Sequence, residues 1–461
     1  MTSAVDGLVS GLSTSSLISQ LMQVEAAPQT RLKTKVSTAE TAVTAYQAVN
    51  TKVSALKTAA DALGQLSTWR AIKATSSSPT VTATAVTGTN GAAGTTTFNV
   101  KELAKSQITT AKVGTGDVTN VSSFEITVGD GSVDSEGNSL DKTYTVELTK
   151  MTAQGIADAI NAKGIPVKAA VVTTGGAENI LQFSGTKTGA AAKFTVTGLT
   201  GVDTTDVTAA QNALLQVAGG EAAGGYDVVN DTNTFTKLMP GVSITVSKQE
   251  NDVRIEAAQD VDGIAAKFQA MVDAANATLS EIGTQTAYDA ANNKASTLTG
   301  DFSVRNMAQA ILGTVSQGVV YPNPDYDVKK KPEEQPGVPK TLAGGSYAQF
   351  GIQLDSTGRL TFDSAKFTSS YGEDPAGVQK LGMAIGGVFE TLAGSQSTNL
   401  KATITGRKSE IDSLNSQIDN WDIRLSARRL ALQKQYSDLE VALGKMNSQS
   451  TWLAGQLAGL S

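Results

Sequence analysis

Two short segments carry side chains whose types could do chemistry. Residues 185–189 read Gly-Thr-Lys-Thr-Gly, a composition found in phosphate-binding loops, but a Walker loop requires lysine directly after its second glycine. Asp355 and Asp363 flank a turn at Gly358 and could offer oxygen ligands to calcium, but the ligand spacing of an EF-hand is missing. A connecting loop and a hairpin account for these residues, so we expect no cofactor and no metal.

A third group is basic. Arg424, Arg428 and Arg429 could bind a polyanion, but Asp419, Asp422 and Asp438 lie on the same helix, which favours a solvated or ion-paired helix face. The 461 residues include 37 basic and 43 acidic side chains, for a net charge of −6. Because no concentrated basic face is visible, we predict no nucleic-acid partner.

Histidine and cysteine are both absent from the sequence. Their absence excludes Ser-His-Asp, Cys-His and HExxH chemistry, disulfides and most transition-metal sites. A polysaccharide-degrading enzyme would still need two closely placed carboxylates in a cleft, and the spacing of the acidic residues nominates no such pair. We therefore predict that the protein is not an enzyme.

Export and membrane signals are also weak. No stretch approaches the roughly 20 apolar residues that span a bilayer, so we predict no membrane insertion. The first residues are small or acidic, and the first basic residue is Arg31, which argues against a cleaved signal peptide.

The strongest periodic signal lies towards the carboxyl end, where apolar residues recur every seven positions. This row predicts one long amphipathic helix. The companion row mixes apolar residues with Arg407, Arg428 and Gln435, so the seam is imperfect and needs a particular partner. The apolar row comprises Ile404, Ile411, Ile418, Leu425, Leu432, Leu439 and Met446.

A matching pattern runs near the amino end from Leu32 to Leu63, with apolar residues spaced by three and four. We expect the chain to go out along one of these helices and return along the other; two unrelated core helices are the alternative. The segment before it is rich in glycine and serine, so we expect it to become ordered on contact with a partner, unless it is a frayed terminus. The candidate residues for assembly and filament contact are Leu8, Leu12, Leu17, Leu21, Leu32, Val36, Val43, Ile411, Ile418, Leu425, Leu432, Leu439, Met446 and Trp452.

Between the terminal helices the apolar period changes from seven to two. Residues 124–128, 144–148 and 242–246 alternate as half-buried strands do. A short helix is expected from about Thr152 and a longer one from Asp260. Five of the ten prolines lie within residues 322–339, which predicts an exposed loop or extended insert.

Five blocks, in the right order, resemble the flagellar filament cap family, also called the flagellar hook-associated protein 2 family. The first is the amino-terminal segment 11–28, with Gly-Leu followed by Leu-Ile-Ser-Gln-Leu-Met-Gln-Val-Glu. The others are residues 235–244 around Pro-Gly-Val, 268–279 with Asn276, 298–305 with Gly-Asp and Arg305, and 351–363 with Gly-Ile and Gly-Arg-Leu. Residues 144–196 are similar to a module that recurs in flagellin and hook-associated proteins.

This resemblance implies a structural cap at the distal tip of the bacterial flagellar filament, which retains exported flagellin and promotes its folding and polymerisation. It implies a homo-oligomeric, pentamer-like plate that contacts flagellin and the neighbouring hook–filament junction proteins, with an export chaperone. It also implies an extracellular location reached through the flagellar type III channel. The alternative is a cell-surface adhesin whose β domains bind a host or environmental ligand.

The expected fold class is α+β multidomain, with N- and C-terminal helices forming a coiled-coil stalk and with a helical domain and two mainly β domains between them. We expect a terminal assembly domain over 1–43 and 430–461, and a helix-rich domain over 44–72 and 258–429. We expect a β domain over 73–110 and 226–257, and an outer β-rich domain over 111–225 that contains the module at about 144–196.

Overall fold

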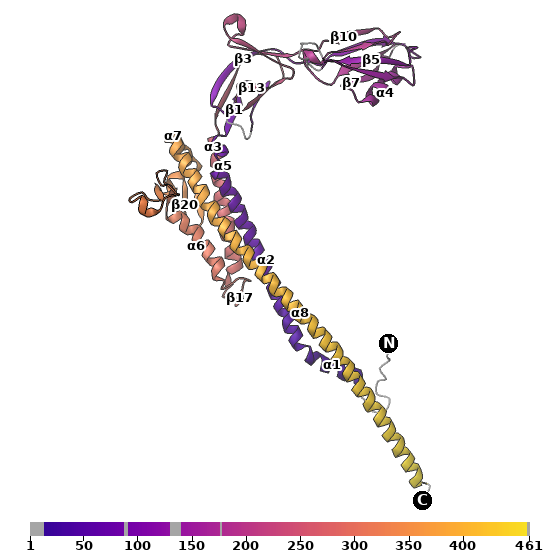
Figure 1. The fold of residues 1–461 in the computed structure, drawn as a ribbon, viewed down its shortest axis with the longest axis vertical. Helices are drawn as coiled ribbons and strands as arrows, with labels where there is room; N and C mark the ends of the chain where they lie inside the picture. The colour runs from indigo at the N-terminus through magenta and orange to yellow at the C-terminus, as the bar shows by residue number, and fades with distance from the viewer. Residues whose placement is uncertain (1–12, 87–90, 130–139, 176–177, 459–461) are drawn as a thin grey trace. The chain divides into compact units, whose positions relative to one another are not determined.

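The structure is a computed structural model, which describes residues 13–86, 91–129, 140–175 and 178–458. The chain forms two units, one made of residues up to 65 and from 264 onward, the other of residues 66–263. Figure 1 labels many of the elements of each.

The first unit is mainly helical, and its centre is a pair of long antiparallel helices, α2 and α8 (Figure 1). The 84 residues of α8 rise about 1.5 Å each, so this helix is about 126 Å long. The out-and-back pairing predicted from the two heptad patterns is confirmed. The helices are α1 (Thr14–Glu25), α2 (Ala27–Gly64), α5 (Val261–Thr286), α6 (Phe302–Ser316), α7 (Ser364–Glu373) and α8 (Pro375–Ala458).

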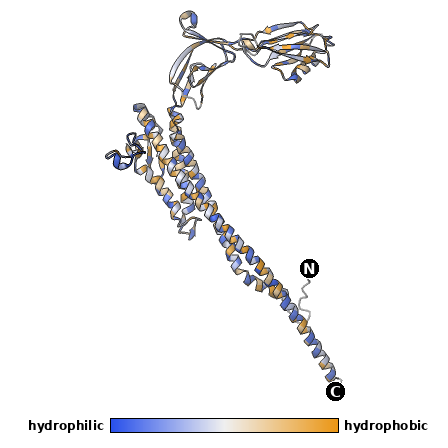
Figure 2. Ribbon diagram, in the orientation of Figure 1, coloured by the Kyte–Doolittle hydropathy of each residue, from blue (hydrophilic) through white to orange (hydrophobic). Residues whose placement is uncertain are grey.

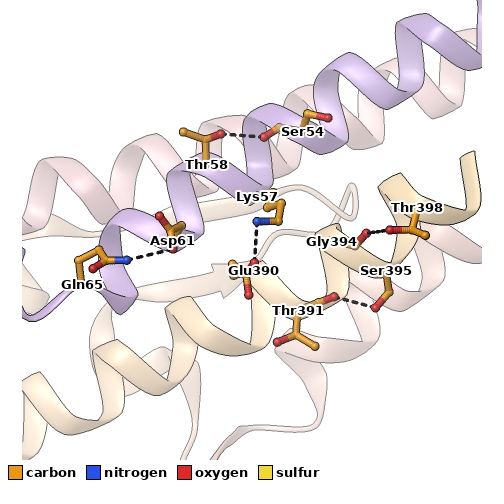
Figure 3. A network of polar contacts seen from close by, with 10 residues as sticks. All are labelled: Ser54, Lys57, Thr58, Asp61, Gln65, Glu390, Thr391, Gly394, Ser395 and Thr398. Carbon is orange, nitrogen blue, oxygen red and sulfur yellow. Dashed lines mark hydrogen bonds and ion pairs between the residues drawn. The ribbon is translucent and has the colours of Figure 1, made fainter. Parts of the chain in front are cut away.

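Apolar burial and a few polar bonds fix the register between α2 and α8. The Lys57 ammonium lies 2.7 Å from the Glu390 carboxylate (Figure 3), and the Ser397 hydroxyl donates to the Asn50 side chain over 2.8 Å. The buried seam residues of α2 are Val43, Tyr46, Val49, Val53, Leu56, Ala60 and Leu63, and those of α8 include Ile385, Phe389, Ala393, Leu400 and Ile404.

Gly386 of α8 lies close to the backbone of α2. A Cβ atom there would lie 2.7 Å from both the Ala60 carbonyl oxygen and the Gly64 nitrogen, so only glycine allows this backbone approach. Helix α8 begins at Pro375, well before the heptad row that starts at Ile404, and this earlier part also packs through large buried side chains such as Ile385 and Phe389.

Helix α1 is ordered against α8 of the same chain. Its side chains Ile18 and Met22 form a buried cluster with Leu432, flanked by Leu425 and Tyr436. The sequence predicts that this glycine- and serine-rich segment becomes ordered only on contact with an apolar surface. In the structure, α8 of the same chain supplies that surface.

Short hairpins complete the first unit. They are β16 (Tyr288–Asp289) with β17 (Lys294–Ala295), β18 (Val319–Pro322) with β19 (Thr341–Gly345), and β20 (Ile352–Leu354) with β21 (Leu360–Phe362). The proline-rich segment lies between β18 and β19, contains the short 3-10 helix η3 (Pro332–Glu334), and is mostly exposed, as predicted. A second 3-10 helix, η4 (Tyr347–Phe350), precedes β20.

The second unit begins with the short helix α3 (Leu66–Trp69) and contains a five-stranded sheet, β1-β15-β3-β11-β12, and a three-stranded sheet, β13-β14-β2. Their apolar faces share one core, which includes Phe98, Leu215 and Ile244. The strands are β1 (Ile72–Ser76), β2 (Val81–Ala85), β3 (Gly94–Glu102), β11 (Ala213–Val217), β12 (Tyr226–Asn230), β13 (Thr234–Met239), β14 (Val242–Val246) and β15 (Glu250–Gln259), with the 3-10 helix η2 (Glu221–Ala223) between β11 and β12.

A separate core in the same unit lies between the sheets β10-β4-β8-β7 and β6-β5-β9 and helix α4. The Thr152 hydroxyl caps α4 by accepting from the Gly155 nitrogen, where the sequence predicts a helix start. The bounds are β4 (Ile108–Val113), β5 (Ser123–Val128), β6 (Lys142–Glu147), α4 (Ala153–Lys163), β7 (Val167–Thr173), β8 (Asn179–Gly185), the 3-10 helix η1 (Ala190–Ala192), β9 (Phe194–Thr197) and β10 (Thr204–Thr208).

The strands predicted at 124–128, 144–148 and 242–246 correspond to β5, β6 and β14. The expected outer domain over 111–225 contains β11, which pairs with β3 outside that range. The four-part domain division stays a prediction.

Candidate assembly surface

The predicted assembly residues fall into two groups according to their burial. Those of α2 and the middle of α8 lie in the seam within the chain: Val43 and Leu432 are buried, and Leu32, Val36, Ile411, Ile418 and Leu425 are half-buried. These side chains pack within the chain, between α8 and either α2 or α1, and their role in assembly stays a prediction.

The second group lies at the end of α8, where the same heptad row turns outward to solvent. Leu432 is 7% exposed, whereas Leu439 is 46% and Met446 58% exposed. Trp452 follows at 66%, and Leu453 and Leu457 are exposed as well. Tyr436 is the last α8 residue in the cluster that α1 covers, so from there onward α8 presents apolar side chains without a described partner helix.

Helix α1 adds two of the predicted residues to the exposed surface. Leu17 and Leu21 lie beside the buried Ile18 and Met22 and are both exposed. Leu8 and Leu12 lie outside the described residues. We use the name terminal apolar surface for Leu439, Met446, Trp452, Leu453 and Leu457 of α8.

The arginines near this surface are used within the helix pair. Arg428 pairs with Glu25 at 3.2 Å, and the guanidinium of Arg424 lies 5.4 Å from the ring centre of Trp421. Arg429 lines a groove of about 350 Å³ between α1 and α8, together with polar side chains such as Gln23 and the apolar side chains of Met22 and Leu425. Arg428 is therefore ion-paired, but with an acid of α1 and not with one of the aspartates on its own helix that the prediction named.

Asp301, which lies in one of the blocks that resemble the family, links α6 to α2 in the first unit. Its carboxylate caps α6 by accepting from the nitrogens of Ser303 and Val304, and it also accepts from the Tyr46 hydroxyl of α2. Burial alone raises the pKa of Asp301, but these hydrogen bonds outweigh it and hold the pKa below its ordinary value. Arg407 of α8 interacts with the same Tyr46 hydroxyl.

The two aspartates considered as calcium ligands have structural roles. In the β20–β21 turn, Asp355 accepts from the Thr357 hydroxyl and from the backbone nitrogens of Arg359 and Thr357, and these hydrogen bonds lower its pKa. Asp363 caps α7 through the nitrogens of Ala365 and Lys366. Hairpin and cap chemistry therefore accounts for both residues, as the sequence suggests.

Sequence reasoning missed three asparagines that act as backbone clamps. The side chain of Asn276 both donates to the Leu360 carbonyl and accepts from the Leu360 nitrogen, at 2.8 and 2.9 Å. Asn161 does the same to Ala169, and Asn233 to Ala104. No spacing rule marks such a residue, since its partner is distant in sequence or on another element.

Two family models match the chain. The model described as the flagellar hook-associated protein 2 N-terminus matches residues 10–107, and the model of the C-terminus matches residues 210–448, more than half of the chain. The chain belongs to the flagellar hook-associated protein 2 family. The N-terminal match covers α1 and α2, and the C-terminal match covers most of α8.

Two relatives in this family match over nearly their whole length. Flagellar hook-associated protein 2 of Escherichia coli K12 is 25% identical over 98% of this chain and 97% of its own. The A-type flagellar hook-associated protein 2 of Pseudomonas aeruginosa is 23% identical over 100% of this chain and 98% of its own.

A solved structure shows the same fold. The D1-D2-D3 domains of the flagellar cap protein FliD from Escherichia coli align with a TM-score of 0.57 at 21% identity, over 79% of this chain and 99% of that one. The α+β class, with helices from both ends of the chain and a β-rich middle, is thereby confirmed. None of the described helices is long and apolar enough to cross a membrane.

Proposed function

We propose that this chain is a structural cap at the distal tip of the bacterial flagellar filament, which retains exported flagellin and promotes its folding and polymerisation. Membership of the flagellar hook-associated protein 2 family supports this role, and so does the fold it shares with a protein named as a flagellar cap. The family gives no support to the adhesin alternative.

The observation that carries the proposal is the terminal apolar surface. An isolated helix end gains nothing by exposing Leu439, Met446 and Trp452 to water, whereas burying such side chains contributes roughly 1.5 to 3 kcal/mol each. A cap has to hold on to a filament while subunits enter beneath it. An apolar helix stripe that fills an apolar groove between partner helices meets that need.

The remaining partners follow from the same role. We propose that the chain acts as a homo-oligomeric, pentamer-like plate in contact with flagellin and with the hook–filament junction proteins. We further propose that an export chaperone shields the apolar stripe before export, and that export uses the flagellar type III channel. The division into a terminal assembly domain, a helix-rich domain and two β domains belongs to this proposal.

The experiment places two charges on the terminal apolar surface without touching the helix seam. In Leu439→Glu/Met446→Glu, two carboxylates have to be desolvated on docking, at a cost of several kcal/mol. The matched control is Ser437→Glu/Asn447→Glu, which adds the same charge at exposed polar positions of the same helix segment.

We expect the Leu439/Met446 variant to fold, to lose motility and to leak flagellin into the medium, while the control keeps long filaments. Normal motility and filament length in the Leu439/Met446 variant would contradict the proposed docking. Normal filaments combined with a loss of attachment to surfaces would instead favour the adhesin.

A further inference from the structure

Helix α1 covers a part of the heptad row that leads into the terminal apolar surface. Its side chains Ile18 and Met22 lie against Leu432 of α8, with Leu425 beside them. Figure 2 shows hydrophobic and hydrophilic residues alternating along α1 and the adjoining part of α8. The terminal apolar surface begins at Leu439, seven residues after Leu432. If α1 moved away, Leu425 and Leu432 would therefore extend that surface by two positions of the same row.

The helix is interrupted between α1 and α2. Helix α1 ends at Glu25, and α2 begins at Ala27. Pro28, in the first turn of α2, carries no N–H group and so cannot close the backbone bond that one continuous helix would make at this point. The break at Ala26 gives α1 a place to change direction while α2 stays where it is.

On the α2 side of this break, the chain is firmly attached to α8. Gln29 is only 6% exposed, and its amide donates to the Asp422 carboxylate at 2.6 Å and to the Ile418 carbonyl at 3.4 Å. Further along α2, Val49 and Leu56 are completely buried or nearly so. Opening the α2–α8 seam would expose these side chains and break these bonds, so α2 stays paired when α1 moves.

On the α1 side of the break, the attachment is weaker. Glu25 and Arg428 form an ion pair at 3.2 Å, but both side chains are exposed, and such pairs contribute little in water. The packing is also incomplete, because the groove of about 350 Å³ between α1 and α8 has Met22 and Leu425 in its walls. Side chains that face a groove lack part of their contacts. Helix α1 is therefore easier to open than the α2–α8 seam.

We propose that α1 is a releasable cover on α8, which has to turn away at Ala26 when the chain docks on the filament. A helix of the filament then takes the place of α1 against Leu425 and Leu432, because a row with heptad spacing packs best against another helix. The inference rests on the proposed docking of the terminal apolar surface and adds a selection step to it. Only a partner whose contact with α8 outweighs that of α1 is retained.

A reversible cross-link tests the cover, because the chain has no cysteine of its own. In Glu25→Cys/Arg428→Cys, a short bis-methanethiosulfonate linker ties α1 to α8. The probe is a preparation of cap-free filaments assembled from purified flagellin of the same organism. Microscopy counts the filament ends that carry the fluorescently labelled chain. We expect the linked chain to dock at least about tenfold more weakly than the unlinked chain, and reduction of the linker to restore docking.

The matched control places the same linker between α2 and α8. In Lys57→Cys/Glu390→Cys it replaces an ion pair of 2.7 Å in the seam that stays closed, so docking should be the same with and without the linker. Ile18→Ala loosens α1 without changing α8. This variant should dock at least about threefold more tightly than the wild type, because a larger fraction of the chain is already open. Ser16→Ala, at an exposed position of α1, should dock as the wild type does.

A distance measurement follows the movement directly. Spin labels on Ser16→Cys and Gln433→Cys, both at exposed positions, report the separation of α1 and α8 in the free and in the docked chain. Helix α1 has 12 residues and is about 18 Å long, so its start should move away from α8 by more than about 10 Å on docking.

Three results overturn the inference: full docking of the linked Glu25/Arg428 variant, an unchanged distance in the docked chain, or docking of Ile18→Ala that is no tighter than that of the wild type. In each of them the wild type still docks, so the cap proposal stands. A wild type that binds no filament end contradicts the cap proposal itself, and the inference falls with it.

Discussion

Leu432 and Leu430 of α8 form a matched pair for testing what holds α1 in place. They are the same residue type, two positions apart on one helix, but Leu432 is 7% exposed in the cluster with Ile18 and Met22, whereas Leu430 is 66% exposed. Replacing Leu432 by alanine removes apolar contacts and leaves a gap that α1 cannot fill. Replacing Leu430 removes only solvated surface.

The magnitude follows from the size of the cluster. A buried Leu→Ala change costs about 2 to 5 kcal/mol in closed cores. Only five side chains make up this cluster, and two of them are half-buried, so we take the lower end, about 2 kcal/mol. A loss of that size raises the population of detached α1 about 30-fold. Leu430→Ala should change the free energy of detaching α1 by less than about 0.5 kcal/mol.

Amide hydrogen exchange resolves this effect, because α1 can open without unfolding of the rest of the chain. We expect amides of α1 to exchange about 30-fold faster in Leu432→Ala and at the wild-type rate in Leu430→Ala. Exchange in the middle of α2 should be unchanged in both. If α1 exchanges equally in the two variants, this cluster does not hold it, and the reasoning from burial fails.

Three further outcomes can be measured by thermal or chemical unfolding. Gly386→Ala should lose about 1 to 3 kcal/mol of stability through overpacking, whereas Gly387→Ala, whose Cβ meets nothing within 4 Å, should be neutral or slightly stabilising; equal effects would argue against the close approach. The folded-state pKa of Asp301 is lowered, so its contribution is present above the ordinary value near 3.9 and is lost as the pH falls through the lower folded value; Asp301→Asn should reduce the fall in melting temperature between about pH 4 and about pH 2, and an unchanged fall would contradict the linkage. Asn276→Ala removes both bonds to Leu360 and should cost about 1 to 3 kcal/mol, with faster exchange in β20 and β21; wild-type exchange there would show that the clamp is dispensable.

Periodicity predicted the long-range pairing well, because α2 and α8 are held mainly by apolar side chains repeated at heptad spacing. The same logic missed the part of α8 between Pro375 and Ile404, although it contributes buried side chains such as Ile385 and Phe389 to the pairing. The weak helix propensity of α1 was also a poor guide, because Ile18 and Met22 pack against Leu432, a residue more than 400 positions away.

The polar part of the first unit could be predicted only in part. Asp301 and Asp363 stand directly before helices, where a cap is a local and recognisable signal. The bond from Tyr46 to Asp301 and the clamp from Asn276 to Leu360 depend on how the elements pack. Neither pair can therefore be predicted from the sequence alone. Resemblance to the family marked Asp301 and Asn276 as members of blocks, and the structure supplies the physical reason.

One heptad row on α8 contains both residues that pack within the chain and residues that are exposed to solvent. The boundary between the two lies where the contact with α1 ends. The spacing is the same from Ile404 to Met446, so nothing in the row itself separates residues that stabilise the chain from residues that are free for a partner. The buried residue Thr14 marks the start of α1, and the α1-covered cluster ends at Tyr436 on α8. Substitutions before Tyr436 therefore act first on stability and those after it on assembly, which is why the Leu432 and Leu439 experiments need different readouts and have to be interpreted separately.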